Sequence, residues 1–360
     1  MSPHTPSHPS TAIAPAAPVI WADPSRKAAF NTWLGSLAAH ALQPATLRLA
    51  SADASFRRYL RIDSANGTRI IMDAPTEKED SKPFVDIARL MAQAGLHVPE
   101  VLAWDVAHGF LLLTDLGDKT MLQTMVTDNP QANNASYMQA VDALIMWQLA
   151  SKPGILPPYD AAMLRRELAL FPDWYITVHR GIAVEGDVKK TLEAAFNEIV
   201  AQNLRWPSVY VHRDFMPRNL MLGNPLGILD FQDAVYGPVT YDIASLMRDA
   251  FLTWEEDFVL DITIRYWEKA RKAGLPVGDD FGEFYRGVEW MGLQRHLKIA
   301  GIFARLTLRD GKPQYLADAP RFIDYIRATC SRYRELKPLL RLIDRIEGFE
   351  AATGFAYGRV

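Results

Sequence analysis

Three polar residues near the middle of the chain are of types that could do phosphate chemistry. Asp214 and Asn219 are five positions apart, and Asp230 follows eleven positions after Asn219. A carboxylate can take the proton of an attacking hydroxyl, and carboxylate and amide oxygens are hard ligands that bind Mg²⁺. We therefore predict that Asp214 is catalytic and that Asn219 and Asp230 hold Mg²⁺ against a phosphate group. A lone Asp or Asn would instead indicate a solvated turn.

Short β-prone segments are expected to position these residues. Residues 209–211 come shortly before Asp214, and residues 227–229 directly precede Asp230. We expect the two segments to form a β hairpin inside a region that is otherwise helical, because apolar residues recur there at helical spacing. The helices predicted for that region span residues 134–150, 160–180, 186–203, 240–272, 281–307 and 319–347.

The first third of the chain has a different pattern. Residues 59–62 and 69–72 read as strands, and Asn66-Gly67 between them is a strong hairpin turn signal. Further strands are predicted over residues 98–102 and 110–113, with helices over residues 26–40 and 83–94. We therefore predict an α+β fold with a small β-rich N-lobe over residues 25–115 and a larger, mostly helical C-lobe over residues 116–360.

Composition excludes several classes of protein. The 360 residues include 39 Lys and Arg against 42 Asp and Glu, and this net charge of −3 argues against nucleic-acid binding. A single cysteine, Cys330, excludes an internal disulfide or a multi-cysteine metal site and fits the cytoplasm. No apolar run is long enough to cross a bilayer, so no membrane partner is expected. Residues 1–24, rich in Pro, Ser, Thr and Ala, read as a disordered tail.

The polar set also resembles a known family. Residues 212–219 and 228–233 are similar to the catalytic loop and metal-binding segment of protein kinases. They resemble even more the aminoglycoside phosphotransferase family, in which an aromatic and a polar residue follow the second Asp. The resemblance implies a protein-kinase-like two-lobed fold, ATP as co-substrate and Mg²⁺ as cofactor. It also implies structural support by His212 and by a buried Asp242 that hydrogen-bonds the catalytic-loop backbone.

Other segments resemble one group within that family, the bacterial N-acetylmuramate/N-acetylglucosamine anomeric kinases of cell-wall peptidoglycan recycling. The resemblance implies ATP-dependent phosphorylation of the C1 hydroxyl of an amino sugar. Two alternatives stay open: the same fold acting on an aminoglycoside, choline or homoserine, and a catalytically silent nucleotide-binding or scaffold module. The segments that carry the resemblance are residues 53–59, 72–75, 113–117, 230–242, 294–298 and 301–306.

The N-lobe departs from the kinase pattern at its phosphate-binding lysine. Met72 or Asp73 stands in the position of that lysine. Arg57, Arg58, Arg69 and Lys78 are candidate substitutes, although each could equally be a surface charge. Backbone N–H groups of residues 51–55 could bind the phosphates, and the resemblance places adenine at the connector between the lobes. The predicted nucleotide-binding residues are Ser51, Ser55, Arg57, Thr114, Asp115 and Leu116.

The acceptor site is predicted from aromatic and carboxylate side chains, which are the groups that sugar pockets use. Trp174 and Trp254 could equally belong to the core. An excess of positive charge over residues 283–312 could attract the muramyl carboxylate or could be a solvated helix face. His296 is expected to be structural or to hydrogen-bond the acceptor, and not to bind a metal; the oligomeric state stays open. The predicted substrate-binding residues are Glu167, Trp174, Tyr175, Trp254, Glu255, Arg295 and His296.

Overall fold

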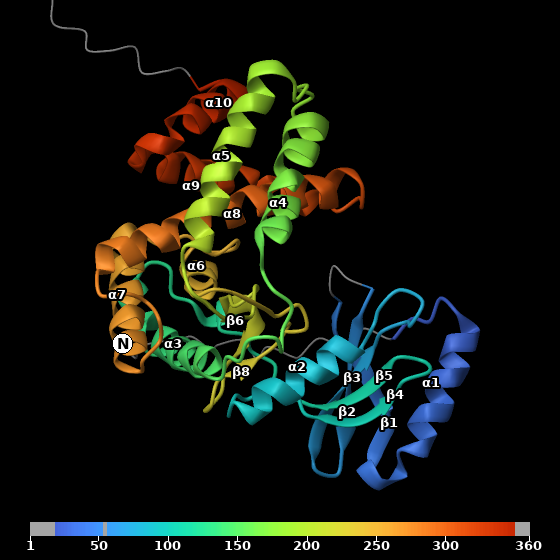
Figure 1. The fold of residues 1–360 in the computed structure, drawn as a ribbon. Coiled ribbons are helices and arrows are strands. Elements are labelled where there is room, and N and C mark those ends of the chain that lie inside the picture. Colours follow the sequence, from blue (N-terminus) through green and yellow to red (C-terminus); the bar gives the residue numbers. More distant parts are fainter. Residues whose placement is uncertain (1–18, 53–55, 350–360) are drawn as a thin grey trace, which may run out of the picture. The chain divides into compact units, whose positions relative to one another are not determined.

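The computed structural model describes residues 19–52 and 56–349, which fall into two compact units (Figure 1). The first unit comprises the described residues up to Arg89 together with Pro99–Leu116. The second comprises Leu90–Val98 and the described residues from Gly117 onward. The first unit is built on an antiparallel sheet and the second is mostly helical, which confirms the predicted α+β class.

A five-stranded antiparallel sheet forms the first unit, in the order β1-β2-β3-β5-β4. The predicted hairpin is present, with pairs running from Arg58↔Asp73 to Ser64↔Gly67. Gly67 has a φ of +92°, a conformation that favours glycine in tight hairpin turns. The strands are β1 (Leu42–Ala52), β2 (Arg58–Ser64), β3 (Gly67–Asp73), β4 (Val101–Asp105) and β5 (Phe110–Thr114).

Helix α1 (Pro24–Ser36) closes the core of the first unit with an aromatic cluster. Phe30 lies edge-on to Phe110 at 5.4 Å between ring centroids, and Trp21 lies 4.8 Å from Phe30. The tail predicted over residues 1–24 therefore does not extend to residue 24, because Trp21 packs on this cluster. Residues 1–18 of that expected tail lie outside the described residues.

Two further helical segments belong to this part of the chain. The 3₁₀ helix η1 (Ala38–His40) follows α1, and α2 (Lys82–Gln93) precedes Gly95, whose φ of +85° ends the helix as predicted. The chain passes from the first unit to the second inside α2.

The second unit contains most of the helices predicted from the sequence, with three differences. The helix predicted over residues 240–272 is two helices, the one over 319–347 is also two, and the one over 160–180 changes to a π-helix after Leu170. The helices are α3 (Asn134–Leu149), α4 (Ala161–Leu170), the π-helix η4 (Phe171–His179), α5 (Gly186–Leu204), α6 (Tyr241–Met247), α7 (Glu256–Lys272), α8 (Phe281–Leu308), α9 (Ala319–Arg332) and α10 (Lys337–Glu347).

Local chemistry explains both helix breaks. Asp249 accepts a hydrogen bond from the Phe251 N–H at 3.1 Å, a side-chain contact that competes with helical backbone bonding. Glu255 then takes an extended conformation before α7 begins. Between α9 and α10, Tyr333 is extended and Pro338 stands in the first turn of the new helix, where proline is tolerated.

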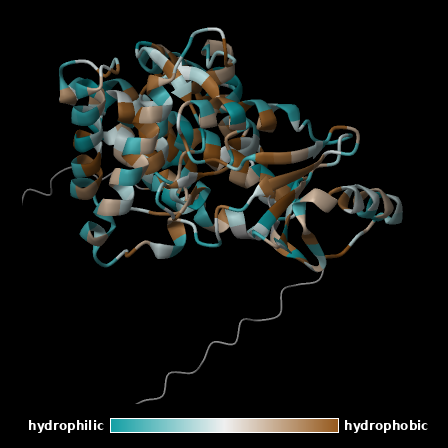
Figure 2. Ribbon diagram, turned by 90° about the horizontal axis from the view of Figure 1, so that it is seen from below, coloured by the Kyte–Doolittle hydropathy of each residue, from teal (hydrophilic) through white to brown (hydrophobic). Residues whose placement is uncertain are grey.

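Helix α8 is the central element of the second unit. It packs against η4, α4, α6 and α9 and is buried over most of its length. A Cβ at Gly301 would stand 2.3 Å from the Leu170 carbonyl oxygen, so glycine lets the two backbones approach closely. Figure 2 shows hydrophobic stretches on the strands of the sheet and along helices of the second unit. In the described part of the chain, no helix is long and apolar enough to span a membrane.

Short strands in the second unit correct the predicted pairing. Residues 209–211 do not pair with residues 227–229. Instead, β6 (Ser208–Val211) pairs with β9 (Val235–Pro238), and β7 (Leu220–Met221) pairs with β8 (Gly227–Ile228). The loop after β6 ends in the 3₁₀ helix η5 (Pro217–Asn219). The Leu229 N–H, just after β8, donates to the Asn219 carbonyl, so the strand that follows η5 lies next to β8. The other 3₁₀ helices are η2 (Leu122–Thr124), η3 (Pro130–Asn133), η6 (Pro313–Asp318) and η7 (Arg334–Leu336).

Candidate active site

The β7–β8 ladder brings together the three polar residues singled out in the sequence. Asn219 immediately precedes β7, and Asp230 stands two positions after the end of β8. The Leu229 N–H donates to the Asn219 carbonyl at 2.9 Å. The Asn219 side-chain Nδ2 donates to the Asp214 carbonyl at 2.9 Å and to the Asp230 Oδ2 at 3.3 Å. All three residues therefore converge inside the second unit.

His212 links the loop to the end of β8 in one protonation state. The Asp214 N–H donates to His212 Nδ1 at 3.3 Å, so Nδ1 carries no proton. Nε2 must then carry the proton and donate to the Leu229 carbonyl at 3.0 Å. Complete burial lowers the pKa of His212 to about 4, which keeps the ring neutral. The ring thus links the backbone at Asp214 to the backbone at Leu229, the residue before Asp230.

Asp242, in the first turn of α6, also holds the backbone of this loop. Its Oδ2 accepts the His212 N–H at 2.7 Å, and its Oδ1 accepts the Arg213 N–H at 3.0 Å. The expected contact with the loop backbone is therefore present. Asp242 is fully buried, and this burial raises its pKa to about 7.

Two loop residues have backbone conformations that side chains rarely adopt. Arg213 has a φ of +78° and Asp230 a φ of +61°. Each such conformation costs about 1–3 kcal/mol and persists where surrounding contacts enforce it. Asp242 holds the Arg213 N–H, and Arg295 Nη1 from α8 donates to the Arg213 carbonyl at 2.6 Å. The two residues with strained backbone, Arg213 and Asp230, therefore both lie at the polar site.

Glu167, predicted to bind substrate, lies in a buried ionic cluster beneath the loop. It pairs with the Arg213 guanidinium and, at 2.8 Å, with Lys298 Nζ. Its Oε2 also accepts Gln294 Nε2 at 2.9 Å and the Tyr159 hydroxyl. Burial alone would raise the pKa of Glu167, but the two cations outweigh it and lower the pKa to about 2. Its carboxylate is occupied by contacts within the chain.

Three other predicted substrate residues line one cavity of about 190 Å³. Trp254 and Glu255 come from the break between α6 and α7, and His296 comes from α8. We call this cavity the acceptor-side pocket. Trp254 also donates from Nε1 to the Tyr137 hydroxyl at 2.7 Å, so it belongs to the core as well. The remaining lining residues are Arg248, Glu256, Glu289, Gly292, Tyr325, Ala328, Thr329 and Arg332.

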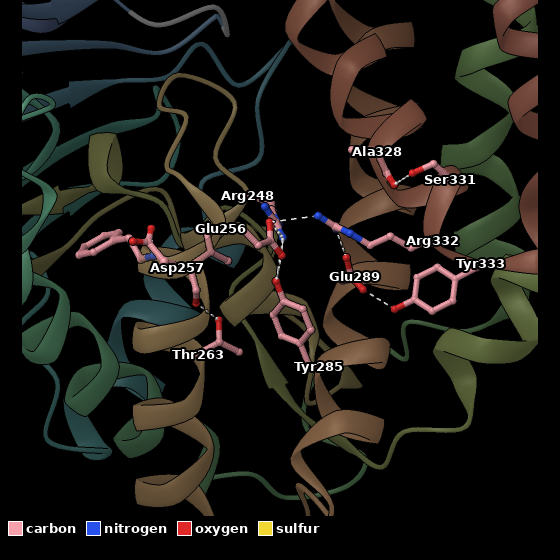
Figure 3. A network of polar contacts seen from close by, with 12 residues as sticks. Arg248, Glu256, Asp257, Thr263, Tyr285, Glu289, Ala328, Ser331, Arg332 and Tyr333 are labelled. Carbon is pink, nitrogen blue, oxygen red and sulfur yellow. Dashed lines mark hydrogen bonds and ion pairs between the residues drawn. The ribbon is translucent and has the colours of Figure 1, made fainter. Parts of the chain in front are cut away.

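Ion pairs connect the charged residues of this pocket (Figure 3). Arg248 Nη2 donates to both Glu256 carboxylate oxygens at 2.9 Å. Arg332, which reaches in from α9, lies 3.3 Å from the Glu256 carboxylate and also pairs with Glu289. The Tyr285 hydroxyl donates to Glu256. Both arginines in the pocket wall are thus neutralised by carboxylates of the chain.

Two predicted substrate residues, Trp174 and Tyr175, are not among the residues that line this pocket. Both lie on the π-helix η4. The Tyr175 hydroxyl donates to the Glu347 carboxylate at 2.9 Å, and the Trp174 ring lies 5.9 Å from the Arg309 guanidinium. The structure therefore does not bring these two residues together with Trp254, Glu255 and His296.

In the first unit, neither residue at the position of the phosphate-binding lysine of kinases is available to bind a phosphate. Met72 is fully buried on β3. Asp73 pairs with Arg58 Nε at 2.6 Å and with Arg26. Arg57 Nη2 lies 3.1 Å from the Glu79 carboxylate. These contacts hold two of the candidate phosphate-binding arginines within the first unit.

The other candidate cations also have neighbours in the first unit. Arg69 donates to the carbonyls of Asn66 and Thr68, and Lys78 Nζ lies 4.7 Å from the centre of the Phe56 ring.

The remaining predicted nucleotide residues lie on or near strands. Thr114 Oγ1, at the end of β5, accepts the Glu100 N–H at 2.9 Å. Asp115 pairs with Arg61 through two contacts of 2.6 and 3.0 Å. Ser51 lies in β1, Leu116 is the last residue of the first unit, and Ser55 lies outside the described residues.

Sequence reasoning missed most of the pocket wall, including Arg248, Glu256, Glu289 and Arg332. We predicted one continuous helix over residues 240–272, whereas the segment between α6 and α7 is not helical and supplies part of the pocket wall. One signal could have revealed it: Glu255, Glu256 and Asp257 form an acidic run of the kind that begins helices.

Known proteins match the chain over most of its length. The model of the phosphotransferase enzyme family matches residues 46–280. An N-acetylmuramate/N-acetylglucosamine kinase of Pseudomonas aeruginosa is 46% identical over 91% of this chain and 99% of its own length. The same-named kinase of Neisseria meningitidis is 47% identical over 86% of this chain and 94% of its own.

Solved structures share the fold at low sequence identity. A choline/ethanolamine kinase family protein from Mesorhizobium loti has a TM-score of 0.60 at 15% identity, covering 89% of this chain and 99% of its own. The GDP complex of aminoglycoside 2'-phosphotransferase-IIIa has a TM-score of 0.58 at 12% identity, covering 86% of this chain and 99% of its own. The predicted kinase-like two-lobed fold is thereby confirmed. With the family model matched over more than half of its length, the chain belongs to the phosphotransferase enzyme family.

Proposed function

We propose that this phosphotransferase is an ATP- and Mg²⁺-dependent kinase of amino sugars. Its acceptor would be the C1 hydroxyl of N-acetylmuramate, N-acetylglucosamine or both, in cytoplasmic peptidoglycan recycling. The observation that carries the proposal is the 46% identity that extends over 99% of the P. aeruginosa N-acetylmuramate/N-acetylglucosamine kinase.

Asp214 is the proposed catalytic base. Its carboxylate takes the proton of the sugar hydroxyl as the hydroxyl oxygen forms a bond to the γ-phosphorus of ATP. The bond between that phosphorus and the β–γ bridging oxygen breaks, and ADP leaves. His212 and Asp242 support this role because they hold the backbone on which Asp214 stands.

The donor set fits a magnesium ion. Asn219 uses Nδ2 for its contacts with Asp214 and Asp230, which leaves the amide oxygen Oδ1 to face a cation. In the described residues, no group of three or more His, Cys, Asp or Glu side chains could hold a metal alone. Two protein ligands with phosphate oxygens and waters suit Mg²⁺, which often binds in this way. When bound, the ion would screen the negative charge of the triphosphate.

We also propose nucleotide contacts in the first unit. Backbone N–H groups around Ser51 and Ser55, together with Arg57, would bind phosphates. Backbone groups of residues 114–116 would bind the adenine edge. Because the Thr114 N–H already donates to the Glu100 carbonyl at 3.1 Å, we assign base recognition mainly to Asp115 and Leu116.

The acceptor-side pocket is the proposed sugar site. It combines aromatic faces with carboxylates and a histidine, which are groups that bind sugars. Helix α6 with its C-cap residue Arg248, and helix α8, support this assignment, because each supplies one residue that contacts the 212–214 loop and another that lines the pocket. Asp242 and Arg295 contact the loop, whereas Arg248 and His296 line the pocket.

One ³¹P NMR experiment tests the proposal. Purified protein is incubated with ATP, Mg²⁺ and one acceptor at a time: N-acetylmuramate, N-acetylglucosamine or kanamycin. We expect a sugar phosphate whose phosphorus couples to the anomeric proton, formed with at least one amino sugar and not with kanamycin. Phosphate on another hydroxyl, turnover of kanamycin alone, or ATP binding without turnover of any acceptor would contradict the proposal.

A further inference from the structure

Arg218 carries an exposed guanidinium directly before the proposed metal ligand Asn219, and within the described part of the chain no carboxylate pairs with it. From this we infer that Arg218 binds the lactyl carboxylate of N-acetylmuramate and so favours this acidic sugar over N-acetylglucosamine. The inference rests on the proposed function and names a residue that selects within its substrate class.

The side chains of Arg218 and Asn219 contact different parts of the second unit. Both residues lie in the short helix η5, which follows the loop that carries Asp214. Asn219 is buried and donates to Asp214 and Asp230, where we propose that Mg²⁺ and the triphosphate bind. The Arg218 guanidinium instead lies 4.6 Å from the centre of the Phe251 ring. Its contact is therefore separate from those of the two proposed metal ligands.

Phe251 belongs to the segment that builds part of the wall of the acceptor-side pocket. This segment, between α6 and α7, also supplies Trp254 and Glu255 to the wall. Arg218 follows Asp214 by four positions and contacts this segment, so it is linked to both features that the acceptor must reach. In N-acetylmuramate the lactyl ether stands on C3, two ring carbons from the reacting C1 hydroxyl. Its carboxylate is thus near enough to that hydroxyl for a long side chain beside Asp214 to bind it.

The Phe251 ring orders the guanidinium without neutralising it. A cation over an aromatic face is attracted to the ring and keeps its full charge. The guanidinium N–H groups can still donate in pairs to a carboxylate. Phe251 is itself held, because its N–H donates to Asp249 at 3.1 Å and its ring lies 6.3 Å from the Phe303 ring. The cation is therefore partly ordered before a ligand binds, which reduces the entropy lost on binding.

Asp249 is an acidic neighbour of Arg218, but it does not form an ion pair with it. Burial raises the pKa of Asp249 to about 6, whereas hydrogen bonds from the Phe251 and Ala250 backbone and the charges of Arg295 and Arg218 lower it. Arg218 thus interacts with this carboxylate through space only, and its N–H groups stay available to a ligand.

The arginines of the pocket wall are not available to a substrate carboxylate. Arg248 pairs with Glu256, and Arg332 pairs with Glu256 and Glu289. The pocket lining holds three carboxylates against these two arginines, so a further carboxylate would be repelled there. The neutral parts of the sugar suit the pocket, and the lactyl carboxylate suits a cation outside it.

The positive charge over residues 283–312, which we expected to attract the muramyl carboxylate, is largely used within the chain. Arg295 is 2% exposed and donates to the Arg213 carbonyl. Three further cations of this range form ion pairs, namely Lys298 with Glu167, Arg286 with Glu335 and Arg309 with Asp310. Arg218 lies outside the range and combines exposure, the lack of a carboxylate partner and a position close to Asp214.

Matched substrates and variants test the inference by steady-state kinetics. N-acetylmuramate is compared with its methyl ester, which keeps the lactyl group without its charge, and with N-acetylglucosamine, which has no lactyl group. Arg218→Gln removes the positive charge and Arg218→Lys keeps it. Arg341→Gln, an exposed change on α10, is the control. The KM for ATP and the thermal midpoint are measured for each protein, and the sugar KM values are repeated at raised NaCl.

We expect the wild-type KM for N-acetylmuramate to be about tenfold below that for its methyl ester, because only the acid makes a charged hydrogen bond. Arg218→Gln should remove this difference and leave the KM values for N-acetylglucosamine and ATP close to wild type. Arg218→Lys should recover part of the loss, because lysine keeps the charge but not the paired N–H groups. NaCl should raise the KM for N-acetylmuramate in wild type and much less in Arg218→Gln. Arg341→Gln should match wild type.

Three results would overturn the inference. One is an unchanged KM for N-acetylmuramate in folded Arg218→Gln. Another is a wild-type enzyme that treats the acid and its ester alike or that accepts N-acetylglucosamine only. The third is a raised KM for ATP with equal losses for both sugars, which would show that Arg218 binds phosphate instead. A wild-type protein that phosphorylates no amino sugar would refute the proposed function, and the inference with it, so the wild-type assays separate the two failures.

Discussion

The loop that carries Asp214 and the acceptor-side pocket are held together by different kinds of contact. In the loop, Asp242, His212 and Arg295 fix the backbone around Asp214 through hydrogen bonds within the chain. In the pocket wall, ion pairs do the same work: Arg248 pairs with Glu256, and Arg332 pairs with Glu256 and Glu289. The loop is therefore held by hydrogen bonds to its backbone, whereas the pocket wall is held by ion pairs between side chains. Changes in the loop should affect turnover, and changes in the pocket should affect the choice of sugar.

The largest effect is expected at Asp230. Asp230→Ala removes the carboxylate that pairs with Asn219 and that we propose as a metal ligand, so Mg²⁺-dependent turnover should fall below detection. Coupled ADP-release assays across a Mg²⁺ titration measure this. Asp233→Asn, an exposed change three residues away, is the control and should keep wild-type turnover. An Asp230→Ala enzyme that retained Mg²⁺-dependent activity would refute the metal assignment.

Asp214→Asn should have the next largest effect. The amide cannot take a proton, so kcat should fall by roughly 10²–10⁴ while the KM values for sugar and ATP stay close to wild type. Single-turnover measurements at saturating substrates test this. If kcat is nearly unchanged, or if the change appears in the sugar KM instead, the division of roles between loop and pocket fails.

Glu167 tests whether the loop depends on the buried ionic cluster beneath it. Because its pKa is lowered to about 2 in the folded state, its stabilising contribution is present above pH 4.5 and is lost as the pH falls towards 2. Glu167→Gln leaves Arg213 and Lys298 buried without their partner and should lower the free energy of unfolding by about 3 kcal/mol at pH 7.

Urea denaturation at several pH values measures the difference between wild type and Glu167→Gln. The difference should shrink as the pH drops below 4.5, because the unfolded wild type then binds a proton at Glu167 that the folded state, with its pKa of about 2, does not. A difference that is constant between pH 7 and pH 3 would show that the ion pairs are not its cause.

The smallest effect is expected at the edge of the pocket. Glu255 is exposed, and exposed charges contribute little to stability or affinity. Glu255→Gln should change the sugar KM by less than about threefold and leave kcat unchanged. A larger effect would show that Glu255 contacts the sugar directly and that the selective part of the pocket includes its exposed edge.

Local signals were sufficient to predict that Asp214, Asn219 and Asp230 lie together. The spacing of Asp214, Asn219 and Asp230 identified a set that the β7–β8 ladder does bring together. The β2–β3 hairpin was also predictable, because Asn66-Gly67 is a strong turn signal. In both cases the decisive contacts join residues that are close in sequence, so residue type and spacing carry the information.

The pocket could not be predicted in the same way. Arg332 and Glu256 are 76 positions apart in the chain, and their contact depends on how α9 lies relative to the start of α7. The pairing of β6 with β9, in place of residues 227–229, is a similar case, because either partner fits the β-prone pattern. Trp174 and Tyr175 have suitable chemistry for a sugar pocket, but they lie on a π-helix whose contacts are to Arg309 and Glu347.

Helix α8 places Arg295 against the loop and, one residue later, His296 in the pocket. Adjacent helical positions point about 100° apart, so a rotation or shift of this helix would displace both contacts at once. During evolution, a change of sugar preference achieved by moving α8 would therefore misalign the transfer machinery. New acceptor preferences should arise instead through α9 and the segment between α6 and α7, which can vary while α8 keeps its place.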